Sequence, residues 1–167
     1  MRTLLLLLAL CLSVSTCVRA SSSDSDMVAV GEGVMTYMFW DVYAAKLYTP
    51  SGEYQFGQHP MRLTLTYLRD FKAKDIVKAT KDQWRHLGKP EHVQAYGPVI
   101  EDLWPDIRKG DSLSYETSAE GVGAFYFNGE LLTEIEDSNF SDAFTAIWLS
   151  PDTSEPKLRK QLIGASE

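Results

Sequence analysis

The segment Arg62–Leu68, RLTLTYL, alternates strictly between polar and apolar side chains. Successive side chains of a β-strand point to opposite faces of a sheet, so this period of two predicts a half-buried strand. One face of the strand carries Leu63, Leu65 and Tyr67, and the other carries arginine and threonine. The chain must therefore build a sheet with one covered face and one face in contact with water.

Other strand-like segments lie on both sides of this one. Residues 28–48 are rich in β-branched and aromatic residues and contain two glycines, which predicts one long bent strand or two strands. Strand character returns at residues 112–117 and 124–135. Within the second of these, Asn128-Gly129 predicts a type I′ hairpin turn.

Apolar residues at helical spacing predict four helices between and after these strands. The first covers residues 72–88, and a second amphipathic segment covers 93–107 with a kink at Gly97-Pro98. A third helix is predicted over 140–148, and Ser154-Glu155-Pro156 opens a short fourth one. The order of strands, two helices, strands and two helices predicts an α+β domain in which helices cover one face of an antiparallel sheet.

The first twenty residues, MRTLLLLLALCLSVSTCVRA, have the pattern of a secretory signal peptide. We expect cleavage after Ala20, because Thr16 is a poor residue to precede a lipid-accepting Cys17. The sequence thus predicts an exported, periplasmic protein in which lipoprotein anchoring is disfavoured. Residues 21–26, SSSDSD, form a polar lead-in that we expect to be disordered, and the folded domain is expected to cover residues 27–167.

The predicted mature chain is acidic and contains no cysteine. Both cysteines lie in the leader, so the 147 residues that remain must be held together by their own core. Fourteen basic against 23 acidic side chains give this chain a net charge of −9, which excludes nucleic acid and an anionic membrane surface as expected partners. No stretch after the leader approaches the length of a transmembrane helix.

The sequence contains no recognisable catalytic motif. Nucleophile elbow, phosphate loop and zinc-protease patterns are absent from it. Its histidines are scattered, so we expect no metal site and no cofactor.

Arg69 is the polar residue that stands out by its position. It continues the period of two set by Leu63, Leu65 and Tyr67, so one further residue of strand would place its guanidinium group on the covered face. There it needs an anion. Two interpretations remain open, and one is an anchor for a ligand carboxylate at the mouth of an apolar cleft. The other is an internal ion pair with one of the acids Asp41, Asp70 and Asp75.

Aromatic residues supply the rest of the candidate site. Tyr37, Phe39 and Tyr43 are expected to be neighbours if the odd-numbered face of residues 28–48 is the covered one. Most aromatic rings must form the core of a domain without disulfides. The predicted ligand-binding residues are Arg69, Tyr37, Tyr43, Tyr67 and Trp84.

Several segments together resemble the exported bacterial branch of the chalcone isomerase-like family. They are GEGVMTYMFWDVYAAKLYTP, RLTLTYLRDF, WPDIRKGD, FYFNGE and IWLSPDTSEPKLRKQLIG, which come in the family's order over residues 28–164. The resemblance implies an open-faced β-sandwich, a large antiparallel sheet with a layer of helices on one face. Members of the family include plant enzymes that close chalcones to flavanones and fatty-acid-binding relatives that catalyse nothing.

The resemblance argues against the reaction that gives the family its name. The plant enzymes use an arginine, a threonine, a tyrosine and an asparagine. These fall near Val34 or Met35, Tyr43, Lys72 and Ala79 respectively, and none is kept. Loss of the arginine removes the cation that stabilises a developing phenolate or enolate.

Three functions remain open. The first is a non-catalytic periplasmic module that binds a small amphipathic ligand, such as a fatty acid or a similar hydrophobic carboxylate. The second is a structural or protein-interaction domain with a collapsed cavity, whose protein partner the sequence does not indicate. The third is an isomerase or lyase of unknown substrate.

Overall fold

The computed structural model describes residues 27–165, and the predicted signal peptide and lead-in lie outside this range. Six strands form one antiparallel sheet in which each strand pairs with its neighbours in chain order. The strands are β1 (Val28–Tyr37), β2 (Trp40–Thr49), β3 (Met61–Tyr67), β4 (Ser112–Thr117), β5 (Gly123–Phe127) and β6 (Glu130–Ile135).

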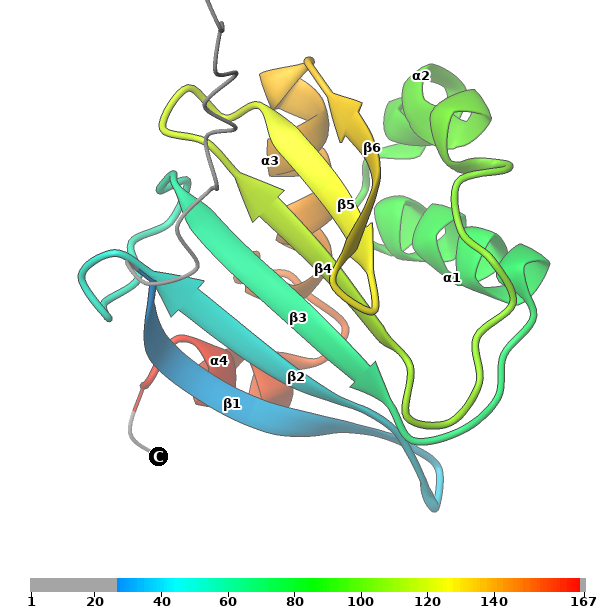
Figure 1. Ribbon diagram of the computed structural model, residues 1–167, viewed down its shortest axis with the longest axis horizontal. Coiled ribbons are helices and arrows are strands. Elements are labelled where there is room, and N and C mark those ends of the chain that lie inside the picture. The colour runs from blue at the N-terminus through cyan, green and yellow to red at the C-terminus, as the bar shows by residue number, and fades with distance from the viewer. Residues whose placement is uncertain (1–26, 166–167) are drawn as a thin grey trace, which may run out of the picture.

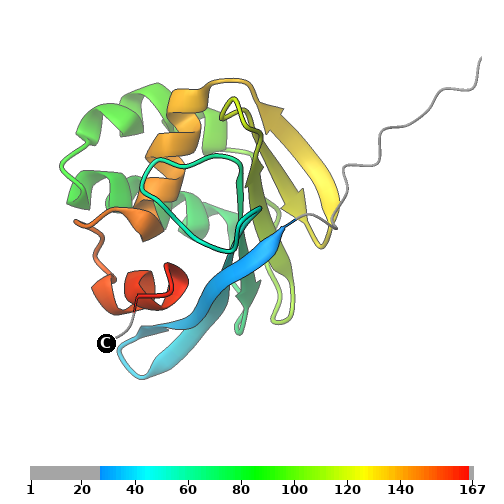
Figure 2. The same ribbon diagram turned by 90° about the vertical axis from the view of Figure 1, so that its left-hand side faces the viewer.

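Four helices lie together on one face of this sheet and leave the other face open (Figures 1 and 2). This arrangement confirms the predicted α+β class and the open-faced sandwich. The helices are α1 (Ala73–His86), α2 (Pro90–Ile100), α3 (Ser138–Leu149) and α4 (Pro156–Leu162).

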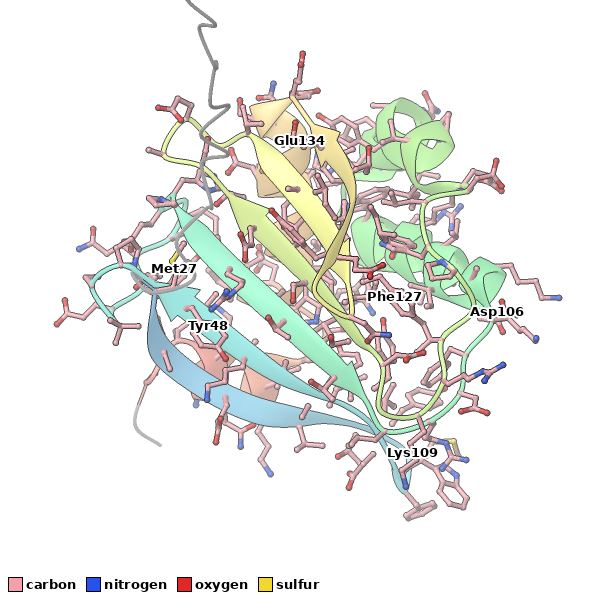
Figure 3. The ribbon with its side chains drawn as sticks, viewed as in Figure 1. Met27, Tyr48, Asp106, Lys109, Phe127 and Glu134 are labelled. Atoms are coloured by element: carbon pink, nitrogen blue, oxygen red, sulfur yellow. The ribbon has the colours of Figure 1, made fainter. Side chains whose placement is uncertain are left out.

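The open face of the sheet carries polar pairs. Thr64 and Ser114 hydroxyls are 2.9 Å apart, and the Arg62 guanidinium lies 3.3 Å from the Glu116 carboxylate. Arg62 also stacks over the ring of Tyr48, which Figure 3 labels on this face. The alternation of polar and apolar residues in β3 therefore separates the two faces as the sequence predicted.

Two hairpins follow from local sequence. Residues 28–48 form two strands, because the chain turns at Met38-Phe39, where Met38 adopts a φ of 56°. Between β5 and β6, Asn128 and Gly129 have φ values of 50° and 84°, as the predicted type I′ turn requires.

The predicted second helix is wrong in its length. It ends at Ile100 rather than continuing to Ile107, and the pair Gly97-Pro98, at which a kink was expected, lies inside it. The chain leaves the helix because Ile107 forms an antiparallel bridge with Phe71 through two backbone hydrogen bonds of 2.8 and 2.9 Å. Trp104 and Ile107 are buried nonetheless. The apolar spacing of these two residues indicated that they are buried, but it did not show that the backbone around them is helical.

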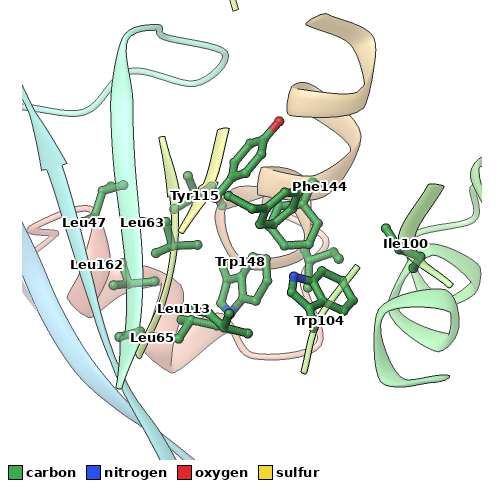
Figure 4. Packing of buried hydrophobic residues seen from close by; sticks show 14 of the residues in the cluster. Leu47, Leu63, Leu65, Ile100, Trp104, Leu113, Tyr115, Phe144, Trp148 and Leu162 are labelled. Atoms are coloured by element: carbon green, nitrogen blue, oxygen red, sulfur yellow. The ribbon is translucent and has the colours of Figure 1, made fainter. Parts of the chain in front are cut away.

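Aromatic side chains fill most of the space between the two layers. Tyr115 and Phe125 of the sheet contact Phe140 and Phe144 of α3. Figure 4 shows Phe144, Trp148 and Trp104 lying together beneath the sheet leucines. A domain of this size without a disulfide is stabilised by such burial.

The glycines of β1 let α4 lie directly on the strand. A Cβ atom on Gly31 would overlap the carbonyl oxygen of Gln161, and one on Gly33 would overlap the Gln161 side chain. Leu158 and Leu162 of the helix are buried at this contact. The two glycines thus serve close helix packing on the first strand.

Candidate functional site

A cavity of about 320 Å³ lies between the sheet and the helix layer. Its floor is formed by residues of β1 to β5, and its roof by α1, α3 and the segment before α4. An apolar cavity of about 150 Å³ holds one benzene molecule, so this one has room for about a dozen non-hydrogen atoms. Its apolar walls include Met35, Leu63, Leu65, Phe71, Ile76, Trp104, Leu113, Phe125, Phe144, Ile147 and Trp148.

Two tyrosines of the sheet bring hydroxyl groups to the cavity lining. Tyr43 and Tyr67 are paired across β2 and β3, and their rings meet edge to face with centroids 5.8 Å apart. The Tyr43 hydroxyl accepts a hydrogen bond of 2.9 Å from the indole Nε1 of Trp148. Within residues 27–165 the Tyr67 hydroxyl has no hydrogen-bond partner, although the residue is only 5% exposed.

Burial keeps both phenols protonated. It raises the pKa of Tyr43 and of Tyr67 well above the ordinary value, because desolvation disfavours the phenolate. Both groups are therefore neutral at physiological pH and carry a proton that can be donated.

Charged side chains on the lining are acidic. They are Asp75 of α1 and Glu155, which precedes α4, and no lysine or arginine of the described chain joins them. Partial burial raises the pKa of the Glu155 carboxyl group. No group of three or more histidine, cysteine or acidic residues in the described range could hold a metal ion. None of the helices in this range has the length and apolarity to span a membrane.

Three of the predicted site residues meet at the cavity. Tyr43 and Tyr67 line it from within, and Tyr37 lines its open side with 65% of its surface exposed. Phe39 is not their neighbour as expected, because it lies in the turn and is 90% exposed. The register of β1 against β2 also shifts between Met35 and Thr36.

Arg69 lies outside the cavity and not on the covered face. Strand β3 ends at Tyr67, so the period of two stops before it reaches Arg69. The side chain is exposed, and its guanidinium carbon lies 4.4 Å from the ring centroid of Trp40. None of its predicted acidic partners forms an ion pair with it in the described structure; Asp41, for example, accepts a hydrogen bond from Thr36. Both interpretations of Arg69 therefore fail on geometry.

Trp84 belongs to the core instead of the cavity. It is fully buried, its indole Nε1 donates a 2.8 Å hydrogen bond to the carbonyl oxygen of Ala143, and its ring contacts Phe140. Its helical spacing correctly indicated the inner face of α1, but the cavity opens beside a different part of that helix, at Ile76 and Thr80.

Three important lining residues were not predicted. Trp148 and Trp104 carried only the signal of helical apolar spacing, which does not distinguish a cavity wall from a packed core. No sequence pattern marked Glu155 as a lining residue, because its position near Tyr43 depends on the path of the segment before α4 in the folded chain.

The cavity coincides with the place where the resemblance puts the catalytic residues of the plant enzymes. Met35, Tyr43 and Ala79 all line it. Lys72, which falls near the catalytic tyrosine, is exposed and lies 2.8 Å from the carboxylate of Asp106. Three of the four matched positions thus lie on one cavity, and none carries the residue type of the plant enzymes.

Comparison with known proteins agrees with this architecture. The chain matches the chalcone isomerase-like family over residues 13–164. An uncharacterized protein of Haemophilus influenzae is 26% identical over 139 residues, which cover 83% of this chain and 68% of that protein. The crystal structure of an Arabidopsis thaliana fatty-acid binding protein has a similar fold, with a TM-score of 0.62, 10% identity and coverage of 83% of this chain and 87% of that one. Since the family match covers most of its length, the chain belongs to the chalcone isomerase-like family.

Proposed function

We propose that this protein binds a small amphipathic molecule in the cavity between sheet and helices, and that it does so without catalysing chalcone cyclisation. The observation that carries the proposal is the cavity itself. Its volume of about 320 Å³ lies within the usual range for small-molecule sites, and its lining is mostly apolar with a few convergent polar groups. An open cavity speaks against the alternative of a domain whose interior has collapsed.

The chemistry of the lining supports binding more than cyclisation. Chalcone closure develops negative charge on a phenolate or enolate oxygen, and such charge is stabilised by a nearby cation. The charged groups on this lining are Asp75 and Glu155, both acids. The similar fold of a fatty-acid binding protein in Arabidopsis is compatible with a binding role.

The ligand class is broader than the sequence suggested. A fatty acid or similar carboxylate was expected on account of Arg69, and the structure places this residue outside the cavity. We therefore propose an amphipathic molecule of about a dozen non-hydrogen atoms, the number that the cavity volume accommodates. The leader-like first twenty residues support export, and the periplasm is the proposed compartment.

A variant that fills the cavity tests the proposal. Ile76→Trp adds a bulky side chain at the wall, and Val99→Trp places the same ring on an exposed position of α2 as a matched control. We expect the neutral fluorescent probe 1-naphthylamine to bind the parent protein and the control, and to lose at least tenfold in affinity for Ile76→Trp. Native mass spectrometry of protein from its own cells should show a bound small-molecule mass. Equal probe affinity for all three proteins would refute the assignment of the cavity as the binding site.

A further inference from the structure

We propose that the polar end of the ligand is an uncharged hydrogen-bond acceptor, such as a ketone, aldehyde or ester carbonyl, and not a carboxylate. This inference rests on the proposed function, because it concerns the same cavity. It follows from a mismatch in the lining between groups that donate hydrogen bonds and groups that accept them.

Two donors on the lining have no acceptor among residues 27–165. The Tyr67 hydroxyl makes no hydrogen bond. The Tyr43 hydroxyl accepts a hydrogen bond from Trp148, and its own proton has no acceptor within these residues. Buried polar groups in folded proteins nearly always have partners, so an unmatched set on one cavity wall indicates a ligand that accepts.

The charges on the lining exclude the simplest acceptor, a carboxylate. Moving an anion from water into an apolar cavity is unfavourable unless a cation accompanies it. The acids Asp75 and Glu155 line this cavity, and they oppose a further negative charge. Arg69, exposed and stacked on Trp40, is not placed to compensate. A ligand carboxylate would therefore have to bind protonated.

A ligand ammonium group fits the acids but not the donors. It carries protons and no lone pair, so the hydroxyl protons of Tyr67 and Tyr43 would remain without an acceptor. A carbonyl oxygen has two lone pairs and carries no charge. The rings of Tyr43 and Tyr67 are neighbours on the lining, so a carbonyl oxygen at this place is an acceptor within the reach of their hydroxyl groups.

The test is a series of ligands that share a ten-carbon chain and differ at the polar end. Displacement of 1-naphthylamine at pH 7 is measured for 2-decanone, decan-1-ol, decanoate and decylamine. We expect 2-decanone to bind at least tenfold more tightly than decanoate or decylamine. Decanoate should gain affinity as the pH falls below about 5, where carboxylic acids take up their proton.

Two variants assign the effect to the hydroxyl group. Tyr67→Phe should weaken 2-decanone about three- to tenfold, the range for one neutral hydrogen bond, and leave decylamine unchanged. Tyr126→Phe is the matched control, because this tyrosine lies outside the cavity on the open face of β5.

The outcomes separate this inference from the proposed function. If none of the four compounds displaces the probe, the cavity is not the binding site and the proposed function fails. If the compounds bind but decanoate or decylamine equals 2-decanone at pH 7, the proposed function stands and the acceptor inference is overturned. An unchanged affinity of Tyr67→Phe for 2-decanone also overturns it.

Discussion

Replacing Arg69 with alanine separates the sequence interpretation of this residue from its position in the structure. The guanidinium group lies on an exposed surface over the ring of Trp40 and forms no ion pair in the described chain. An exposed cation–π contact contributes about 0.5–1 kcal/mol to the free energy of unfolding. Arg69→Ala should therefore lower this free energy by about 1 kcal/mol at most, which corresponds to a melting temperature lower by about 2–4 °C.

Arg62→Ala is the control, because it removes the same type of side chain from a position where the arginine is largely buried and contacts other side chains. Arg62 stacks on Tyr48 at 4.5 Å and lies 3.3 Å from Glu116, and only 17% of its side chain is exposed. We expect its loss to cost about 1–3 kcal/mol.

Urea unfolding monitored by tryptophan fluorescence, together with probe titration, measures both consequences. Probe affinity should be unchanged in Arg69→Ala, because the residue lies outside the cavity lining. A loss of about 3–5 kcal/mol would mean that Arg69 neutralises a buried acid. A tenfold loss of affinity would mean that it reaches the ligand. Either result would refute the placement of Arg69 on the surface, away from the cavity and from any acid of the core.

Four further predictions concern the rest of the molecule. Gly31→Ala should destabilise the domain by about 1–3 kcal/mol in thermal unfolding, because its methyl group meets the carbonyl oxygen of Gln161 in α4; a neutral effect would show that the helix is free to move. Incubation with a 6′-hydroxychalcone should yield flavanone without enantiomeric excess by chiral chromatography, and an enantioselective product would contradict the loss of catalysis. N-terminal sequencing of the exported protein should begin at Ser21, and a thiol assay should find no cysteine; a lipid-blocked Cys17 would contradict this. The free energy of unfolding should decrease as the pH rises above 10. Burial raises the pKa of Tyr115 to about 12 and that of Tyr67 further, whereas the same tyrosines ionise near 10.0 in the unfolded chain. The unfolded chain therefore loses these protons first, and their loss favours unfolding. Absorbance at 295 nm should show these tyrosines ionising together with unfolding, and early reversible ionisation of all eight would refute it.

Most of the fold follows from local patterns. The period of two in β3, the Asn128-Gly129 turn and the helical spacing of α1 each depend on residues close in sequence, and the structure confirms all three. The second helix failed because its end is decided by a long-range bridge between Phe71 and Ile107. Apolar periodicity shows which residues are buried, but it does not show whether the backbone between them stays helical.

The candidate site was less accessible to sequence reasoning. Tyr43 and Tyr67 were found because strand alternation fixes the face on which they lie. Arg69 was misplaced because the end of a strand is the weakest part of a periodic pattern, and a single residue beyond the end changes the direction of a side chain. Trp84 was assigned to the site because burial on a helix does not reveal which part of the interior is left unfilled.

The contact between α4 and β1 has a consequence for how the molecule is assembled. It joins the first strand to the last helix, so it can form only when nearly the whole described chain is available. Strand β1 is an edge of the sheet, and until α4 packs on its face it is held by β2 alone. The free backbone groups of an edge strand are a template for pairing with another chain. A chain shortened by its final helix would keep every residue of the sheet and still lose the element that holds its first strand in place. The last helix therefore limits self-association by holding this edge strand in its place in the sheet.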